Sequence, residues 1–188
     1  MRYEQAYLIL FLSFLTLAGC SGILVNDQDA QQNGKRTFTK KIQDSAIESQ
    51  IHTLLNFQNP RFKNESHLEV ICANGIVVLA GQVPSFQMKE HAAKAAAKQE
   101  FVRKVYNRLR VDKNPYSSDS NDGWLTFKIR FNYLFNDKIP SSQIKIESMQ
   151  GEVYLLGYLP YEEAKKAVEI ARKTKGVKRV INALEYAI

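Results

Sequence analysis

Residues 73–84 read ANGIVVLAGQVP, and residues 149–160 read MQGEVYLLGYLP. The second stretch follows the first at an offset of 76 residues, and two glycines and a proline coincide in the two. In each copy, a turn near the start of the stretch, Asn74-Gly75 or Gln150-Gly151, follows one run that favours a strand (68–72 or 144–146) and precedes another (77–79 or 153–155). This is the pattern of a hairpin with a tight turn. The sequence therefore predicts two copies of one structural unit.

The similarity continues on both sides of the hairpin. Downstream, VYNRL at 105–109 aligns with VINAL at 180–184. Upstream, an aspartate and two apolar residues align in the two copies: Asp44, Ile47 and Ile51 with Asp122, Leu125 and Ile129. Nearly all of the chain after residue 40 thus belongs to the duplication.

Each copy is predicted to run helix, hairpin, helix, strand. Apolar residues at helical spacing indicate the opening helices, and Asp44 and Asp122 are expected to be their N-caps. An alanine-rich helix follows at 88–100 or 161–175, and then a last strand at 105–111 or 180–186. Gly81 and Gly157 are expected where a side chain would crowd the packed helix. The predicted fold is α+β: two tandem αββαβ sandwiches, each with two helices on a small mixed three-stranded sheet.

A leader precedes the duplicated part. The apolar run AYLILFLSFLTL at 6–17 is too short to span a bilayer and is typical of a secretory signal. Leu17-Ala18-Gly19-Cys20 directly after it resembles the bacterial lipobox. That resemblance implies cleavage before Cys20, a lipid anchor (palmitate included) on Cys20, and, from Ser21, delivery to the outer membrane rather than retention at the inner one.

These patterns divide the chain into five parts. We expect a lipoprotein signal peptide at 1–19, a flexible tether with lipidated Cys20 at 20–38, a first unit at 39–112, a linker at 113–121 and a second unit at 122–188.

The amino-acid composition limits the classes of binding partner that the protein can have. The apolar and charged fractions, 45% and 24%, are those of a globular chain, and the net charge of +7 is spread without a basic run. Such a charge suits an anionic head group or serves solubility alone, and nucleic acid is excluded for an exported protein. Of two cysteines, Cys20 is taken by the anchor, so Cys72 is expected to be a small buried hydrophobe without a disulfide.

The duplicated unit resembles the BON domain (bacterial OsmY and nodulation). Its marks are the two glycines, the alanine-rich helix and Gly-Val-x-x-Val-x-Asn, which reads GVKRVIN at 176–182. The first copy departs from this mark, with Glu100 and Phe101 where the second has Gly176 and Val177, so its helix is expected to end without a glycine cap. Two BON units behind a lipobox resemble the dual-BON outer-membrane lipoproteins of Gram-negative bacteria. The resemblance implies a periplasm-facing protein that binds anionic phospholipid (phosphatidylglycerol, cardiolipin) with the opening helix of its second unit and supports envelope integrity.

The sequence itself, without reference to any family, shows an unusual face on the opening helix of the second unit. Placed at 100° per residue, its apolar residues form a core stripe and a second, aromatic stripe. The phospholipid-binding residues expected from the aromatic stripe and its flanking cations are Trp124, Phe127, Lys128, Arg130, Phe131 and Leu134. The aligned positions of the first copy hold three polar residues and a single aromatic one: Ala46, Ser49, Thr53, Asn56 and Phe57. Large aromatic rings and flanking cations are typical of a helix at the membrane interface.

Two alternatives remain open at this stage. The aromatic stripe could instead pack against the first unit as an interdomain core. The protein could also be an envelope scaffold that docks protein partners, such as outer-membrane assembly proteins or cell-wall amidase regulators, because aromatic and arginine patches serve both purposes. An enzyme is disfavoured, since His52, His67 and His91 stand apart and no nucleophile, metal or cofactor motif is present.

Overall fold

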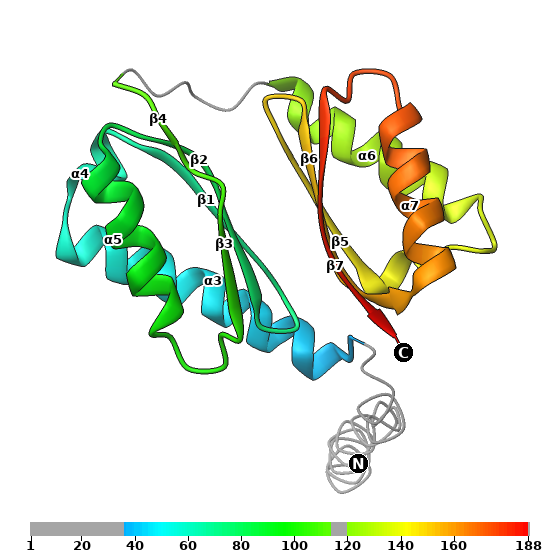
Figure 1. Ribbon diagram of the computed structural model, residues 1–188, viewed down its shortest axis with the longest axis horizontal. Helices are drawn as coiled ribbons and strands as arrows, with labels where there is room; N and C mark the ends of the chain where they lie inside the picture. The colour runs from blue at the N-terminus through cyan, green and yellow to red at the C-terminus, as the bar shows by residue number, and fades with distance from the viewer. Residues whose placement is uncertain (1–35, 114–119, 188) are drawn as a thin grey trace, which may run out of the picture.

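The computed structural model describes residues 36–113 and 120–187 (Figure 1). The predicted signal peptide, Cys20, most of the tether and the centre of the linker lie outside these residues.

The element order matches the prediction. The first unit contains α3 (Phe38–Gln58), a short α4 (Arg61–Asn64), the hairpin β1 (His67–Ala73) and β2 (Ile76–Val83), α5 (Phe86–Ala97), β3 (Lys104–Asn107) and β4 (Arg110–Val111). The second contains α6 (Ser120–Leu134), a 3-10 turn η1 (Ser141–Gln143), β5 (Ile144–Met149), β6 (Glu152–Pro160), α7 (Tyr161–Lys173) and β7 (Arg179–Ala187). In each sheet the hairpin is antiparallel and the last strand runs parallel to the second, so both sheets are mixed as predicted.

The last strand of the first copy is interrupted, where the sequence predicted one continuous strand. The pairing of β2 skips Ala80 and Gly81 and resumes in the same register at Gln82. Gly81 has φ +101, well away from extended backbone, whereas its counterpart Gly157, at φ +155, stays close to it. The bend at Gly81 therefore breaks the ladder locally, while β6 and β7 pair over their whole length.

The two aspartates are not N-caps, and that expectation was wrong. Helix α3 begins earlier, at Phe38, where the Thr37 hydroxyl accepts from the amide of Lys40. Asp44 lies inside the helix, and its carboxylate accepts from the turn amides of Asn74 (3.1 Å) and Gly75 (3.2 Å). Asp122, inside α6, does the same for Gln150 and Gly151. Each aspartate thus ties the opening helix to the hairpin turn.

The strand-end glycines avoid a neighbouring strand rather than a helix. A Cβ on Gly81 would lie 1.9 Å from the His67 carbonyl oxygen, and one on Gly157 would lie 2.5 Å from the Gln143 carbonyl oxygen. The obstacle in each copy is therefore the backbone at the start of the partner strand, which cannot move aside without breaking the hairpin.

Each sheet carries its helices on one face and the other sheet on its opposite face (Figure 1). A third apolar core lies between the sheets, separate from the core of either unit; it is formed by Ile71, Ala73, Ile76, Val78, Ala80, Met149, Tyr154, Leu156, Ile181 and Ala183. Polar pairs close its edges, including an ion pair of Lys145 with Glu48 and one of Arg103 with Glu185 at 2.5 Å. The two units are therefore joined sheet to sheet, with helices outside.

Candidate functional site

The aromatic stripe of α6 lies on the outer surface of the molecule. Its five large side chains are between 49% and 75% exposed: Trp124, Phe127, Phe131, Leu134 and Phe135. The rings form a continuous row, with centroid separations of 5.2 Å for Trp124–Phe127, 6.1 Å for Phe127–Phe131 and 4.6 Å for Phe131–Phe135. Because the interdomain core is made by the sheets, the interpretation of this stripe as an interdomain core is wrong.

The opposite side of α6 holds the helix in place. Leu125, Ile129 and Tyr133 are buried as expected, and the Tyr133 hydroxyl donates to the Ala167 carbonyl at 2.7 Å. Ala167 lies on α7, where small residues let the two helices approach closely. The aromatic stripe is therefore presented by a firmly packed helix.

The matching face of the first copy is largely polar. Ala46, Ser49 and Thr53 are exposed on α3, and Phe57 follows near its end at 86% exposure. Two further apolar side chains, Phe38 and Ile42, are exposed on the first turns of α3. The sequence analysis missed these two because it assigned residue 38 to the tether and started the helix at Asp44.

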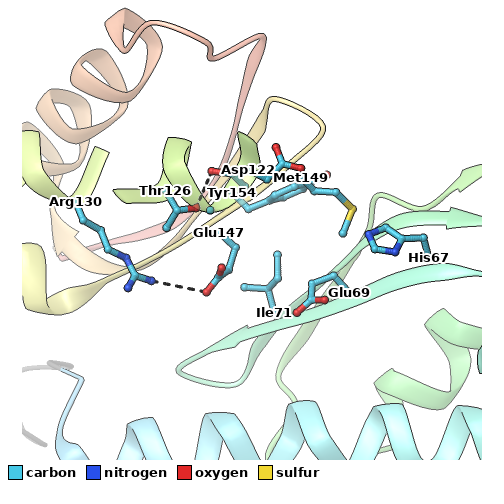
Figure 2. A pocket seen from close by; sticks show the side chains of 11 residues that line it. His67, Glu69, Ile71, Asp122, Thr126, Arg130, Glu147, Met149 and Tyr154 are labelled. Carbon is cyan, nitrogen blue, oxygen red and sulfur yellow. Dashed lines mark hydrogen bonds and ion pairs between the residues drawn. The ribbon is translucent and has the colours of Figure 1, made fainter. Parts of the chain in front are cut away.

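The two cations expected to flank the stripe have different surroundings. The Lys128 ammonium donates to the Lys175 carbonyl at 2.7 Å and stays near Trp124. The Arg130 guanidinium donates to the Ile146 carbonyl at 3.1 Å and lies 3.8 Å from the Glu147 carboxylate. Figure 2 shows Arg130 directed toward Glu147, at the edge of a cavity between the two units. Lys128 is thus the cation beside the stripe, and Arg130 serves chiefly the inner side of α6.

That interdomain cavity has a volume of about 720 Å³ and charged walls (Figure 2). Glu69 of β1 faces Glu147 of β5 across it, with His67 nearby. Loss of solvent around the carboxyl groups raises the pKa of Glu69, an exposed residue at the cavity wall, and that of the half-buried Glu147. The Glu147 carboxylate raises the pKa of Glu69 further, while Lys145 and Arg130 oppose the rise at Glu147. The two carboxylates therefore share a site in which their charged forms are disfavoured.

His91 and Cys72 have structural partners. His91 is hydrogen-bonded to Gln58 at 2.6 Å and contacts the Phe62 ring, while burial lowers the pKa of His52. Cys72 is buried as predicted, and burial raises the pKa of its thiol, which donates to Asp44. Within 36–113 and 120–187, no group of three His, Cys, Asp or Glu side chains is arranged to hold a metal ion. No helix in these ranges is long and apolar enough to cross a membrane.

A family model for the BON domain matches residues 43–113 and again residues 121–188. The chain belongs to the BON-domain family. Among curated proteins it is 33% identical over 152 residues to the outer membrane lipoprotein DolP of Haemophilus influenzae, covering 80% of this chain and 78% of that one. It is 32% identical, with the same coverage, to the 21 kDa hemolysin of Actinobacillus pleuropneumoniae. It is 30% identical to osmotically-inducible protein Y of Escherichia coli, covering 76% of this chain and 72% of that one.

Membership of this family accounts for the duplication, because each match covers one helix–hairpin–helix–strand unit. The two BON units differ on the outer faces of α3 and α6, where α6 carries the row of exposed rings, and the packing of the sheets leaves both faces free.

Proposed function

We propose that this protein is an outer-membrane lipoprotein, anchored through Cys20 and facing the periplasm, that binds anionic phospholipid through the outer face of α6 and so supports the integrity of the outer membrane. The observation that carries the proposal is the exposed row of rings from Trp124 to Phe135 on a helix whose opposite side is buried. A folded protein rarely leaves such a row in water unless a membrane or partner covers it.

The energetics favour a membrane as the cover. Burying only ~200 Å² of this surface in lipid would stabilise the bound state by ~5 kcal/mol at 25 cal/mol per Å². Trp and Phe are suited to the head-group boundary, and Lys128 can meet phosphate there. The similarity to an outer membrane lipoprotein and the lipobox at 17–20 support the location.

The lipid anchor changes what this weak site has to do. Acyl chains on Cys20 already hold the protein at the bilayer, so the helix face is free to set orientation and lipid preference at high local concentration. Replacing Cys20 by Ser is expected to give a chain that carries no lipid by mass spectrometry and no longer fractionates with the outer membrane.

Vesicle co-sedimentation of the unlipidated mature chain tests the lipid site. Trp124→Glu is expected to abolish binding to vesicles that contain phosphatidylglycerol and to leave the circular dichroism spectrum unchanged, because Trp124 is 59% exposed. Ala46→Glu, at the aligned position of α3, is the matched control and is expected to bind like the parent chain. Equal binding by the parent and the Trp124 variant would refute the proposal.

A further inference from the structure

The aromatic stripe ends beside a second feature, a basic pocket of about 610 Å³. Trp124 and Lys128 of α6 form one wall, and Lys175 and Lys178, from the segment between α7 and β7, form the other. We propose that this pocket binds the phosphodiester of an anionic lipid head group and sets the preference for anionic over zwitterionic lipid. The inference rests on the proposed membrane function of α6 and names the residues that bind the lipid head group.

The pocket is held by contacts on both walls. The Lys128 ammonium donates to the Lys175 carbonyl at 2.7 Å, which joins helix α6 to the segment before β7. Since an ammonium has three donors, two remain for a ligand. The alkyl chain of Lys178 lies over the hairpin turn, so close that a Cβ on Gly151 would come within 2.9 Å of it.

The one acidic group in the pocket wall, Asp122, offsets only part of the charge of the three lysines. Asp122 is 6% exposed, and its carboxylate accepts from the amides of Gln150 and Gly151. It is therefore engaged with the turn beneath, while Lys175 and Lys178 are exposed at the mouth of the pocket.

Gly176 keeps the pocket open. It has φ +105, and a Cβ there would lie 3.6 Å from both the Lys128 ammonium nitrogen and a methyl group of Leu125. A longer side chain at this position would extend into the space beside Lys128. Glycine at this position thus allows the left-handed backbone and leaves the Lys128 ammonium group accessible.

The first BON unit provides an internal comparison. The strand pairings Ile76↔Lys104 and Glu152↔Arg179 give an offset of 75, so Glu100 and Phe101 occupy the positions of Lys175 and Gly176. The expected alignment of Glu100 and Phe101 with Gly176 and Val177 was therefore wrong by one residue. Phe101 adopts the left-handed backbone that glycine adopts at 176, at φ +65, and its large side chain is exposed. At the positions of the three pocket lysines, the first unit has Gln50, Glu100 and Arg103. Arg103 already forms an ion pair with Glu185. The first unit therefore has no equivalent cationic pocket.

The position of the pocket suits a head group rather than a free anion. Trp124 belongs to both the stripe and the pocket wall, so a membrane that covers the stripe brings its phosphates to the three lysines. Three ammonium groups attract the net negative charge of phosphatidylglycerol and repel the ammonium of phosphatidylethanolamine. The expected result is a preference between lipids, in addition to binding.

The test compares lysine pairs in the unlipidated mature chain at physiological salt. Lys175→Gln with Lys178→Gln is expected to weaken binding to phosphatidylglycerol vesicles about 30-fold, at about 1 kcal/mol for each lysine near an anionic surface, and to leave weak binding to phosphatidylethanolamine vesicles unchanged. The control pair is Lys94→Gln on α5 with Lys98→Gln at the C-cap of that helix; both lysines are exposed on the first unit. It removes the same charge and should keep the preference within about threefold, because distant charges are screened beyond ~8–10 Å.

The outcomes separate the two proposals. If both lysine pairs weaken binding equally, or the pocket pair binds like the parent chain, the pocket assignment is wrong while the membrane role of α6 stands. If Trp124→Glu also binds like the parent chain, the proposed membrane function of α6 is wrong, and the pocket assignment that rests on it is wrong as well. Trp124 is the sole tryptophan, so its fluorescence reports on the site. A shift with vesicles but not with the same concentration of inorganic phosphate supports a lipid head group, whereas an equal shift with phosphate overturns it.

Discussion

Asp44 and Asp122 perform the same task in the two units. Each carboxylate accepts two hydrogen bonds from the amides of a hairpin turn whose residues have positive φ, such as Asn74 at +52° and Gly75 at +75°. Turning the backbone in this way directs consecutive amides to the same side, where a single carboxylate receives both. The aspartate is therefore the contact that fixes the helix against the hairpin.

Asp122→Ala is expected to lower the free energy of unfolding by about 2–4 kcal/mol, because two partly buried amides lose their acceptor. Urea denaturation followed by circular dichroism measures the change. Asp137→Ala, at an exposed position after α6, is the control and should alter stability by less than about 0.5 kcal/mol. Equal effects of the two substitutions would show that the turn contact contributes little.

Glu69 makes stability depend on pH. Its pKa is raised by burial and by the Glu147 and Glu48 carboxylates, against the opposing charge of Lys145. A carboxyl group whose pKa is higher in the folded state favours folding below its unfolded pKa of about 4.5, and this contribution is lost as pH rises through the folded value.

Glu69→Gln should therefore melt at a higher temperature than the parent chain at pH 7, and the difference should vanish near pH 4. Thermal melts of both chains at the two pH values measure this difference, and the comparison cancels the response of carboxyl groups that do not interact with Glu69. Glu100→Gln, on an exposed turn, should shift the melting temperature little at either pH. A Glu69 variant that is less stable at pH 7 would contradict the raised pKa.

At the scale of elements, α6 shows what the sequence could and could not predict. Helical periodicity separated Leu125 and Ile129 from Trp124 and Phe127, and burial agrees with that division. Periodicity says nothing about which partner covers a face, so only the structure could exclude interdomain packing of the stripe. The interdomain core comes from the face of each sheet opposite its helices, where Ile71 and Leu156 alternate along their strands with residues of each unit's own core.

Long-range contacts were the other source of error. A carboxylate near a helix start is commonly an N-cap, and nothing local to Asp44 indicates that its partners lie about 30 residues away. The lysine pocket was missed for the same reason, since Lys128 and Lys175 are 47 residues apart and meet only when the helix packs against the sheet. The alignment of Glu100 with Lys175 was the available signal.

At the scale of the whole molecule, the shared core between the sheets should make the two BON units unfold together. Leu155 and Leu156 separate this effect from ordinary packing, because both are fully buried on β6 and point to opposite faces. Leu155 belongs to the core of the second unit, and Leu156 to the core between the units.

Either leucine changed to Ala is expected to cost about 2–5 kcal/mol. The two variants should differ in how the units unfold, as followed by calorimetry and hydrogen exchange. The parent chain is expected to show one calorimetric transition, because its units unfold together. Leu155→Ala weakens the second unit, so this transition should move to a lower temperature. It should split into two only if the first unit stays folded after the second has unfolded. Leu156→Ala weakens the contact itself, so the units should uncouple and hydrogen exchange should rise in β2, on the opposite side of the core, as well as in β6. Unchanged exchange in β2 would mean that the two sheets touch without stabilising each other. In that case the outward position of the aromatic stripe would need another cause than the sheet-to-sheet packing described above.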